Sequence, residues 1–287
     1  MTDQRQLEDW NWPHRDYSQF HRAGGLRWHV QRRGTGPALL LLHGTGASLH
    51  SWAGLAPLLW EQHEVVAVDL PGHGFSELPG NEQMSLPGMA AALGGLLDEL
   101  GLQPELIVGH SAGAAVAAQM CLAGLVSPAA LVSVNGALLA LPGLTGQFFS
   151  ISARLLAGIP TLPAWVAGLG GRQRFTQRLI DGTGSTLGDA EVEYYRQLVS
   201  HPRHVAAALR MMANWDLESL QAKLPELRTP THLVVCEQDR TVPPSQSYLV
   251  ARHLAESQLH RLEGLGHLGH EEDPARFAQL LLEIAGR

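Results

Sequence analysis

The chain has 287 residues, of which 45% are hydrophobic and 16% are Asp, Glu, Lys or Arg. This is enough apolar material for one α/β domain with an insertion, or for two smaller domains. The formal net charge of −7 and the single lysine, Lys223, argue against a nucleic-acid partner, because phosphate binding requires clustered Lys and Arg. Two cysteines far apart, Cys121 and Cys236, are typical of buried thiols in a reducing compartment rather than of a disulfide framework.

The beginning of the sequence is polar and has no apolar segment like that of a secretory signal, so we expect a cytoplasmic location. Residues 106–153 contain no Asp, Glu, Lys or Arg. Because Gly, Pro and polar residues interrupt this stretch, it favours buried strands and a buried helix over a membrane span, which needs about 20 continuous apolar residues.

Short strand-like segments alternate with helical ones along the chain. The segment 26–31 alternates in polarity, which is typical of an edge strand. Further strands are predicted at 38–42, 64–68, 106–108, 130–134, 231–236 and 258–262, and helices at 89–100, 112–122, 246–255 and 274–284. This alternation predicts an α/β fold with a mostly parallel central sheet and helices on both faces.

The alternation stops in the middle of the chain. Helical patterns occur at 148–156, 192–198 and 205–212, without a convincing strand between them. We therefore expect a core domain made of residues 1–141 and 225–287, with an all-helical cap, residues 142–224, inserted between two sheet strands.

The motif Gly109-His110-Ser111-Ala112-Gly113 follows the predicted strand at 106–108 and precedes a run of small residues. A serine flanked by glycines at a strand-to-helix turn is typical of a nucleophile elbow, in which the serine hydroxyl attacks a carbonyl group. The turn is sharp, so only residues without a bulky side chain fit beside the serine. With 31 glycines in the chain, the pattern can also arise by chance around a buried structural serine, and its strand-helix context favours the catalytic interpretation.

A nucleophilic serine requires a base and a group that orients the base, which follow it in the order acid and then histidine in this fold. Asp239 lies just after the predicted strand 231–236 and is the preferred acid, with Glu237 as its competitor. His267 lies in the glycine-rich turn after the strand 258–262 and is the preferred base. His267 and His270 could instead bind a metal ion, but neither H-E-x-x-H nor H-x-x-E-H is present, so no metal and no cofactor are expected.

The tetrahedral intermediate of acyl transfer needs two amide donors for its oxyanion. One is expected from Ala112, directly after the serine, and the other from Thr45 in the sequence His43-Gly44-Thr45-Gly46 after an early strand. The remaining histidines near these loops, His43, His73 and His110, are interpreted as structural residues that hydrogen-bond to backbone.

The predicted cap contains an unusual distribution of charge. From residue 106 to residue 180 there is no acidic residue, but there are four arginines, at 154, 172, 174 and 178. They either form a solvated face or an electrostatic contact with the acidic core, or they bind the carboxylate of a bulky apolar ligand. If they bind a ligand, the candidate substrate-binding residues are Phe148, Arg154 and Trp165.

Together these motifs make the chain resemble the α/β-hydrolase superfamily from end to end. More narrowly, it resembles the magnesium-chelatase accessory proteins of bacteriochlorophyll biosynthesis, the BchO type. The segments that carry the narrower resemblance are GGLRWHVQ at 24–31, TGAS at 45–48, GHSAGAA at 109–115, VNGAL at 134–138 and MMANWDL at 211–217.

The resemblance implies a role near the insertion of magnesium into protoporphyrin. Combined with the motifs, it predicts a serine hydrolase that acts on an ester, with a porphyrin carboxylate or ester as a possible apolar substrate. A non-catalytic accessory protein that binds porphyrin or chelatase subunits is an alternative, and a general carboxylesterase is another. The four catalytic elements together favour hydrolysis, because a pure binding protein does not need all of them.

Overall fold

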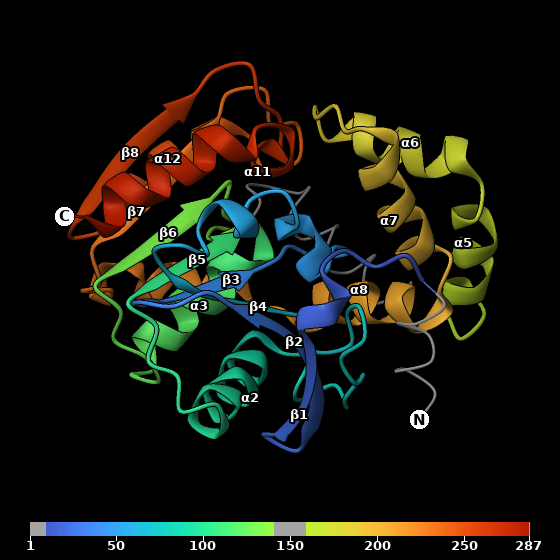
Figure 1. Cartoon of the computed structure of the whole chain (residues 1–287), viewed down its shortest axis with the longest axis horizontal. Coiled ribbons are helices and arrows are strands. Elements are labelled where there is room, and N and C mark those ends of the chain that lie inside the picture. The colour runs from blue at the N-terminus through green and yellow to red at the C-terminus, as the bar shows by residue number, and fades with distance from the viewer. Residues whose placement is uncertain (1–9, 141–158, 287) are drawn as a thin grey trace.

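The computed structural model describes residues 10–140 and 159–286. Its centre is an eight-stranded sheet in the order β1-β2-β4-β3-β5-β6-β7-β8 (Figure 1). The strands are β1 Ser18–Ala23, β2 Leu26–Arg33, β3 Ala38–Leu42, β4 Glu64–Val68, β5 Leu106–His110, β6 Ala130–Val134, β7 Thr231–Cys236 and β8 Ser257–Leu262. The strands from β4 through β3, β5, β6 and β7 to β8 pair in parallel, and β2 is antiparallel to both β1 and β4. The predicted α/β fold with a mostly parallel sheet is therefore confirmed.

Most strand positions follow from the sequence pattern. β3, β4, β6 and β7 begin and end at the predicted residues, because each is an apolar run bounded by turn residues. The prediction that 26–31 is an edge strand is wrong, since β2 has a strand on either side. The outer strand β1 was not predicted because its sequence, SQFHRA, is largely polar. It is joined to β2 by Gly24 and Gly25, whose φ angles of 59° and 77° suit glycine in a tight hairpin turn.

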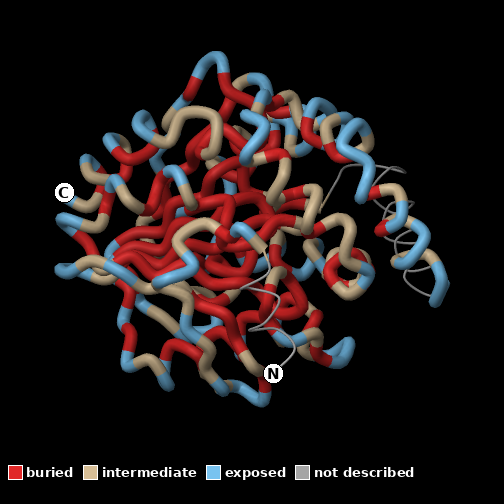
Figure 2. Tube along the Cα trace, turned by 45° about the vertical axis from the view of Figure 1, so that its right-hand side comes forward, coloured by how far each residue is buried: buried red, intermediate tan, exposed pale blue. Residues whose placement is uncertain are grey.

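Helices cover both faces of the sheet, and side chains alternate between two cores. Leu40 and Leu42 of β3 join the core under α2 (Leu86–Glu99) and α3 (Ala112–Leu122). Leu39 and Leu41 join the opposite core under α12 (Pro274–Ala285). Figure 2 shows the result, with buried backbone through the centre of the molecule. The remaining helical elements of the core are η1 Arg15–Tyr17, η2 Leu49–Trp52, η3 Ala56–Leu58, η4 Leu224–Glu226, α10 Pro244–His253 and α11 Gly269–Glu272.

Between β6 and β7, the described residues 135–140 and 159–230 contain helices and connecting loops but no strand (Figure 1). Its helices are α5 Leu162–Gly170, α6 Gln173–Gly182, α7 Asp189–Val199, α8 Pro202–Asn214 and α9 Leu217–Lys223. The patterns at 192–198 and 205–212 correspond to α7 and α8, and the one at 148–156 lies outside the described residues. The expected boundary at 142 also lies outside them, and the expected boundary at 224 falls at the start of η4.

No helix in the described ranges combines the length and the apolar character needed to cross a membrane.

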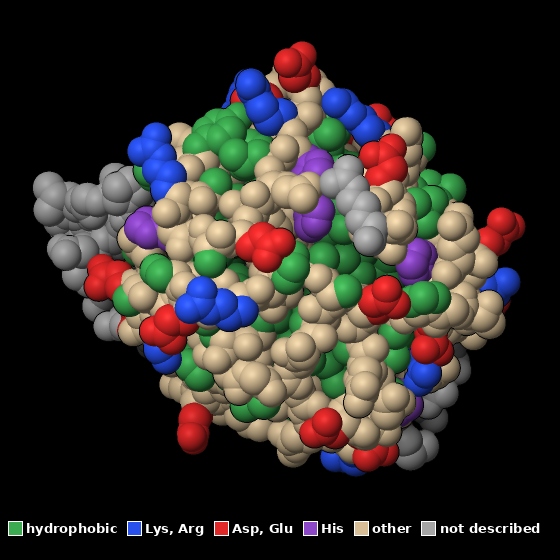
Figure 3. Space-filling model, turned by 90° about the vertical axis from the view of Figure 1, so that its left-hand side faces the viewer, with side chains coloured by type: hydrophobic (Ala, Val, Ile, Leu, Met, Phe, Trp, Pro, Cys, Tyr) green, Lys and Arg blue, Asp and Glu red, His purple; other side chains and the backbone are tan. Residues whose placement is uncertain are grey.

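On the face over the β7–β8 edge of the sheet, acidic and basic side chains are interspersed (Figure 3). Cys236 is buried and Cys121 is partly buried, and both are free thiols.

Candidate active site

Ser111 occupies the turn between β5 and α3, as the motif predicts. Its φ of 50° and ψ of −115° place it in a region that non-glycine residues rarely adopt, so the turn is strained. Backbone hydrogen bonds hold it there: the Ser111 N–H donates to the Val134 carbonyl at 2.9 Å, and the Ser111 carbonyl accepts from the Ala137 N–H at 3.0 Å. The end of β6 thus stabilises the strained backbone of this serine.

The two glycines of the motif are required by close backbone contacts. A Cβ atom on Gly109 would lie 2.4 Å from the Ala114 nitrogen, and a Cβ atom on Gly113 would lie 2.2 Å from the Leu42 carbonyl oxygen. The steric reason given for these glycines from the sequence is confirmed. The lack of a side chain at both positions allows the start of α3 to pack tightly against the sheet.

Asp239 and His267 meet at the carboxyl ends of β7 and β8. The His267 Nδ1–H donates to Asp239 Oδ2 at 2.7 Å, and both side chains are buried. The other carboxylate oxygen, Oδ1, accepts from the amides of Thr241 at 2.7 Å and Val242 at 2.8 Å. These bonds fix the carboxylate, which in turn fixes the ring orientation of the histidine and leaves its Nε2 for another partner.

The competing acid, Glu237, points elsewhere. Its Oε1 accepts hydrogen bonds from Arg261 Nε and from the Tyr248 hydroxyl, both at 2.6 Å. These contacts lie at the protein surface and not beside the histidine.

Several contacts place the His267 turn against the serine turn. The His110 Nε2–H donates to the His267 carbonyl at 2.9 Å, and the two rings lie with centroids 4.6 Å apart at an interplanar angle of 55°. His110 directly precedes Ser111. A hydrogen bond from the Ser111 hydroxyl to His267 does not occur within the described part of the chain, so this link stays a prediction. Such bonds are commonly long in a free enzyme and shorten when substrate binds.

The expected oxyanion donors lie on either side of the serine. Ala112 is the first residue of α3, where the helix dipole favours negative charge. The loop after β3 packs against the serine, since a Cβ atom on Gly44 would be 3.1 Å from Ser111 Cβ. Neither the Thr45 nor the Ala112 amide donates to a protein acceptor within residues 10–140 and 159–286. Their role as oxyanion donors stays a prediction.

The Thr45 side chain faces the cap. Its hydroxyl donates to Met211 Sδ of α8 at 3.4 Å, which leaves the backbone amide as the group available to an oxyanion.

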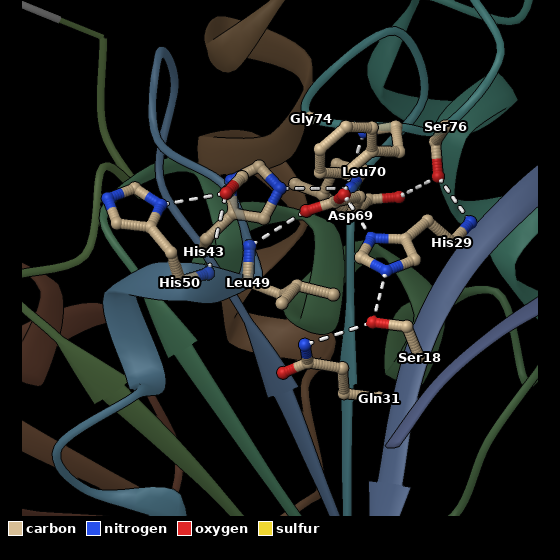
Figure 4. A network of polar contacts seen from close by, with 12 residues as sticks. Ser18, His29, Gln31, His43, Leu49, His50, Asp69, Leu70, Gly74 and Ser76 are labelled. Atoms are coloured by element: carbon tan, nitrogen blue, oxygen red, sulfur yellow. Dashed lines mark hydrogen bonds and ion pairs between the residues drawn. The ribbon is translucent and has the colours of Figure 1, made fainter. Parts of the chain in front are cut away.

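A buried network around Asp69 shapes the loops near the serine (Figure 4). Asp69 Oδ1 accepts from the Leu49 amide at 2.8 Å, and Oδ2 accepts from the Phe75 amide at 2.9 Å and from His29 Nδ1 at 2.7 Å. Burial alone would raise the pKa of Asp69, but His29 and the donated hydrogen bonds outweigh it and lower the pKa to about 2. The carboxylate therefore joins the loops that follow β3 and β4.

His43 belongs to the same network (Figure 4). Its Nδ1–H donates to the Gly44 carbonyl at 2.8 Å, and its Nε2 accepts from the Leu70 amide at 2.9 Å. Burial lowers the pKa of His43 to about 4, so the ring is neutral. The predicted structural roles of His43 and His110 are confirmed, and His73 likewise bonds to backbone, at the Pro71 carbonyl.

Asn135 was not predicted as a site residue, although it appeared in a segment that carries the family resemblance. Its Nδ2 donates to the His267 carbonyl at 2.9 Å and to the Gly266 carbonyl at 3.2 Å, while its Oδ1 accepts from the Cys236 amide at 2.9 Å. Its φ is 47°, a value that asparagine tolerates better than most residues. An asparagine directly after a buried strand was the only signal available.

The predicted substrate-binding residues are not brought together. Phe148 and Arg154 lie outside the described residues. Trp165 is 65% exposed on α5, which forms the outer edge of the cap (Figure 1), so its role stays a prediction. Arginines 172, 174 and 178 are exposed on or next to α6, which favours the solvated-face interpretation for these three.

His270 does not pair with His267 in a metal-binding arrangement. Its Nε2 contacts Ser51 Oγ at 2.8 Å, and burial lowers its pKa to about 3. Within the described residues, His, Cys, Asp and Glu side chains form no group of three or more that could hold a metal ion.

Comparison with known proteins agrees with this fold. Residues 39–280 match the model of the alpha/beta hydrolase family. The chain is 39% identical over 275 residues to the magnesium-chelatase 30 kDa subunit of Rhodobacter capsulatus, covering 95% of this chain and 96% of that protein. It is 29% identical over 264 residues to the pimeloyl-[acyl-carrier protein] methyl ester esterase of Aeromonas hydrophila, covering 90% of this chain and 98% of that protein.

Among solved structures, an alpha/beta hydrolase fold protein from Burkholderia ambifaria superimposes with a TM-score of 0.78 at 26% identity, covering 93% of this chain and 98% of that one. The family model, the relatives and the solved structure agree on an alpha/beta hydrolase fold. The chain belongs to the alpha/beta hydrolase family.

Proposed function

We propose that the protein is a serine hydrolase that cleaves an ester by means of Ser111, His267 and Asp239. The observation that carries the proposal is the buried 2.7 Å hydrogen bond between His267 and Asp239, on turns that lie against the strained serine turn. An aspartate that fixes one ring nitrogen of a histidine leaves the other nitrogen free to act as a general base.

In the proposed reaction, His267 Nε2 takes the proton of the Ser111 hydroxyl while the Ser111 oxygen attacks the ester carbonyl. The amides of Thr45 and Ala112 stabilise the resulting oxyanion. The tetrahedral intermediate collapses, the carbon–oxygen bond to the alcohol breaks, and His267 returns its proton to the departing alcohol. A water molecule, deprotonated by His267, then attacks the acyl-enzyme carbonyl. The bond from the acyl carbon to the Ser111 oxygen breaks, His267 returns the proton to that oxygen, and the acid is released.

We further propose that the substrate is an apolar ester related to magnesium-porphyrin metabolism, such as a tetrapyrrole carboxylate ester, and that the protein acts in the cytoplasm. The similarity over nearly the whole chain to a magnesium-chelatase subunit supports the pathway, and the similarity to a methyl ester esterase supports the bond type. The role would belong to bacteriochlorophyll biosynthesis.

A fluorophosphonate probe tests the chemistry directly, because it labels only an activated serine. We expect stoichiometric labelling of the wild-type protein at Ser111 and no labelling of Ser111→Ala. Folded wild-type protein that does not label would contradict the proposal.

The similarity to a chelatase subunit also favours a second candidate, a non-catalytic accessory protein that binds porphyrin or chelatase subunits. Spectral titration with protoporphyrin, its magnesium complex and its monomethyl ester separates the candidates when it is repeated on Ser111→Ala. If the protein is a hydrolase of this substrate class, the wild-type protein and Ser111→Ala both bind the ester, but only the wild-type protein converts it. Binding without labelling indicates the accessory role, and hydrolysis of short p-nitrophenyl esters without porphyrin binding indicates a general carboxylesterase.

A further inference from the structure

The connection between α6 and α7 of the cap lies directly against the turns that carry Asp239 and His267. We call residues 183–186 the cap turn. Figure 1 shows that this connection approaches α11, which follows the His267 turn. The contacts are made by backbone groups, by the buried hydroxyl of Ser185 and by the carboxylate of Glu272.

One carbonyl of the cap turn bridges the two turns. The Thr183 carbonyl accepts from the Arg240 amide at 3.1 Å and from the His267 amide at 3.3 Å. Arg240 directly follows Asp239. Because both amides share one acceptor, the Thr183 carbonyl sets the separation of the two turns. The hydrogen bond between Asp239 and His267 spans the same separation.

Two more contacts hold the cap turn to the histidine turn. Ser185 is 3% exposed, and its Oγ accepts from the Leu268 amide at 2.8 Å. The carboxylate of Glu272 accepts from the Thr186 amide at 3.1 Å and from the Gly266 amide at 2.8 Å. The amides of three successive residues, 266 to 268, thus have partners that belong to the cap turn or are bonded to it.

The fit between these segments leaves no room for a side chain at two glycines. Gly184 has φ 85°, and a Cβ atom on it would lie 2.2 Å from the Gln238 carbonyl oxygen. A Cβ atom on Gly266 would lie 2.4 Å from the Gly184 carbonyl. The backbone of the cap turn is therefore in direct contact with the turn that carries Asp239 and with the turn that carries His267.

We infer that the cap turn is a positioning element for the catalytic pair: it holds Asp239 and His267 at hydrogen-bonding distance, so that the cap supports the chemistry as well as covering it. This inference rests on the proposed function. It also requires that any movement of the cap to admit substrate leaves the cap turn in place.

Ser185→Ala tests the inference, because it removes the acceptor of the Leu268 amide without changing the backbone. We expect kcat for an ester to fall by about tenfold to a hundredfold, in line with the sensitivity of catalysis to small misplacements. KM should change little, and labelling of Ser111 by the fluorophosphonate should slow in parallel. Ser185→Thr retains the hydroxyl and should restore most of the rate.

Proton NMR adds a measurement of the hydrogen bond itself, which a change in the stability of the cap alone would not alter. The proton between His267 Nδ1 and Asp239 should give a low-field resonance in the wild-type protein that broadens in Ser185→Ala and returns in Ser185→Thr. Ser200→Ala is the matched control, since it removes a cap serine hydroxyl that donates to the Gln197 carbonyl, away from the cap turn. If Ser185→Ala does not fold, Glu272→Gln weakens the same junction from its more accessible side, with a smaller expected loss of kcat.

The outcomes separate this inference from the proposed function. Folded wild-type protein without labelling would contradict the proposed function itself. Normal labelling of the wild-type protein together with unchanged kcat and an unchanged low-field resonance in Ser185→Ala would overturn the inference alone. An equal loss of kcat in Ser200→Ala would also overturn it, because the effect would then arise from general loosening of the cap.

Discussion

The choice between two neighbouring carboxylates illustrates what decides a role at the scale of single residues. Glu237 and Asp239 are two positions apart, after the same strand. Asp239 is buried and bonded to His267 and to two backbone amides, whereas Glu237 is bonded to Arg261 and Tyr248 near the surface. The same functional group therefore has a different chemistry at each position because of what surrounds it.

Substitution of each acid by its amide separates them. Asp239→Asn should lower kcat for an ester by about 10⁴-fold, because the histidine then adopts the wrong tautomer. Glu237→Gln should leave kcat within about twofold, since an exposed ion pair contributes little. Steady-state kinetics on both variants checks this, and similar losses in the two would contradict the assignment of the acid.

Asn135 combines backbone strain with three buried hydrogen bonds. Asn135→Ala should lower the free energy of unfolding by about 2–4 kcal/mol, from unpaired buried backbone groups and from the positive φ. Asn135→Gly loses the same bonds but accepts the backbone conformation, so we expect it to be less destabilising by about 1 kcal/mol. Urea unfolding of both variants measures the difference, and equal values would exclude a contribution from strain.

The turn between β5 and α3 shows how an element imposes its requirements on sequence. The serine is strained, the glycines two residues before and after it have no room for Cβ atoms, and the end of β6 holds the serine backbone. The same packing places the start of α3, with its unpaired amides and positive dipole end, next to the hydroxyl. The geometry that strains the element also suits the proposed attack of Ser111 on a carbonyl group.

Gly113→Ala tests the packing of this element. The added Cβ would lie 2.2 Å from the Leu42 carbonyl, so α3 has to shift, at a cost of about 1–3 kcal/mol in the free energy of unfolding. We expect the rate of fluorophosphonate labelling to fall with it. Gly168→Ala in α5 is the control, because nothing lies within 4 Å of its Cβ, and it should be neutral or stabilising by up to about 1 kcal/mol.

At the scale of the whole molecule, a buried polar contact joins cap and core. Glu271 Oε1 of α11 accepts from the Tyr195 hydroxyl of α7 at 2.6 Å and from the Ser51 hydroxyl at 2.5 Å. Burial raises the pKa of Glu271 to about 8, although both hydrogen bonds act to lower it. The carboxyl group is therefore protonated at neutral pH in the folded protein and ionised in the unfolded one.

This difference makes stability depend on pH. Between the unfolded pKa of 4.5 and the folded pKa of about 8, the folded state binds more protons at Glu271, so the contribution of this group to the free energy of unfolding falls as pH rises and becomes level above that range. Glu271→Gln keeps the acceptor oxygen without the charge. We expect it to remove this dependence and to be more stable than the wild type by about 2–4 kcal/mol at pH 9.

Urea unfolding from pH 5 to pH 9 measures the effect. The gain should be small at pH 5 and grow with pH. Parallel curves for the wild-type protein and the variant would contradict a raised pKa for this group.

The sequence by itself determined the alternation of strands and helices, and it pointed to Ser111, Asp239 and His267. Apolar runs bounded by turn residues define β3, β4, β6 and β7, and the turns that carry the three proposed catalytic residues follow strands whose carboxyl ends meet at one edge of a parallel sheet. It did not predict β1, because a polar outer strand is stabilised by pairing with β2 and not by its own apolar pattern.

Only the tertiary structure decided which segments support the proposed catalytic residues. Asn135, the Thr183 carbonyl and Glu271 act through contacts between segments far apart in the chain. No local periodicity encodes such contacts, and backbone carbonyls carry no residue-specific signal at all. The physical reason is that a hydrogen bond depends on positions in space, which the fold establishes only after the apolar pattern has brought strands and helices together.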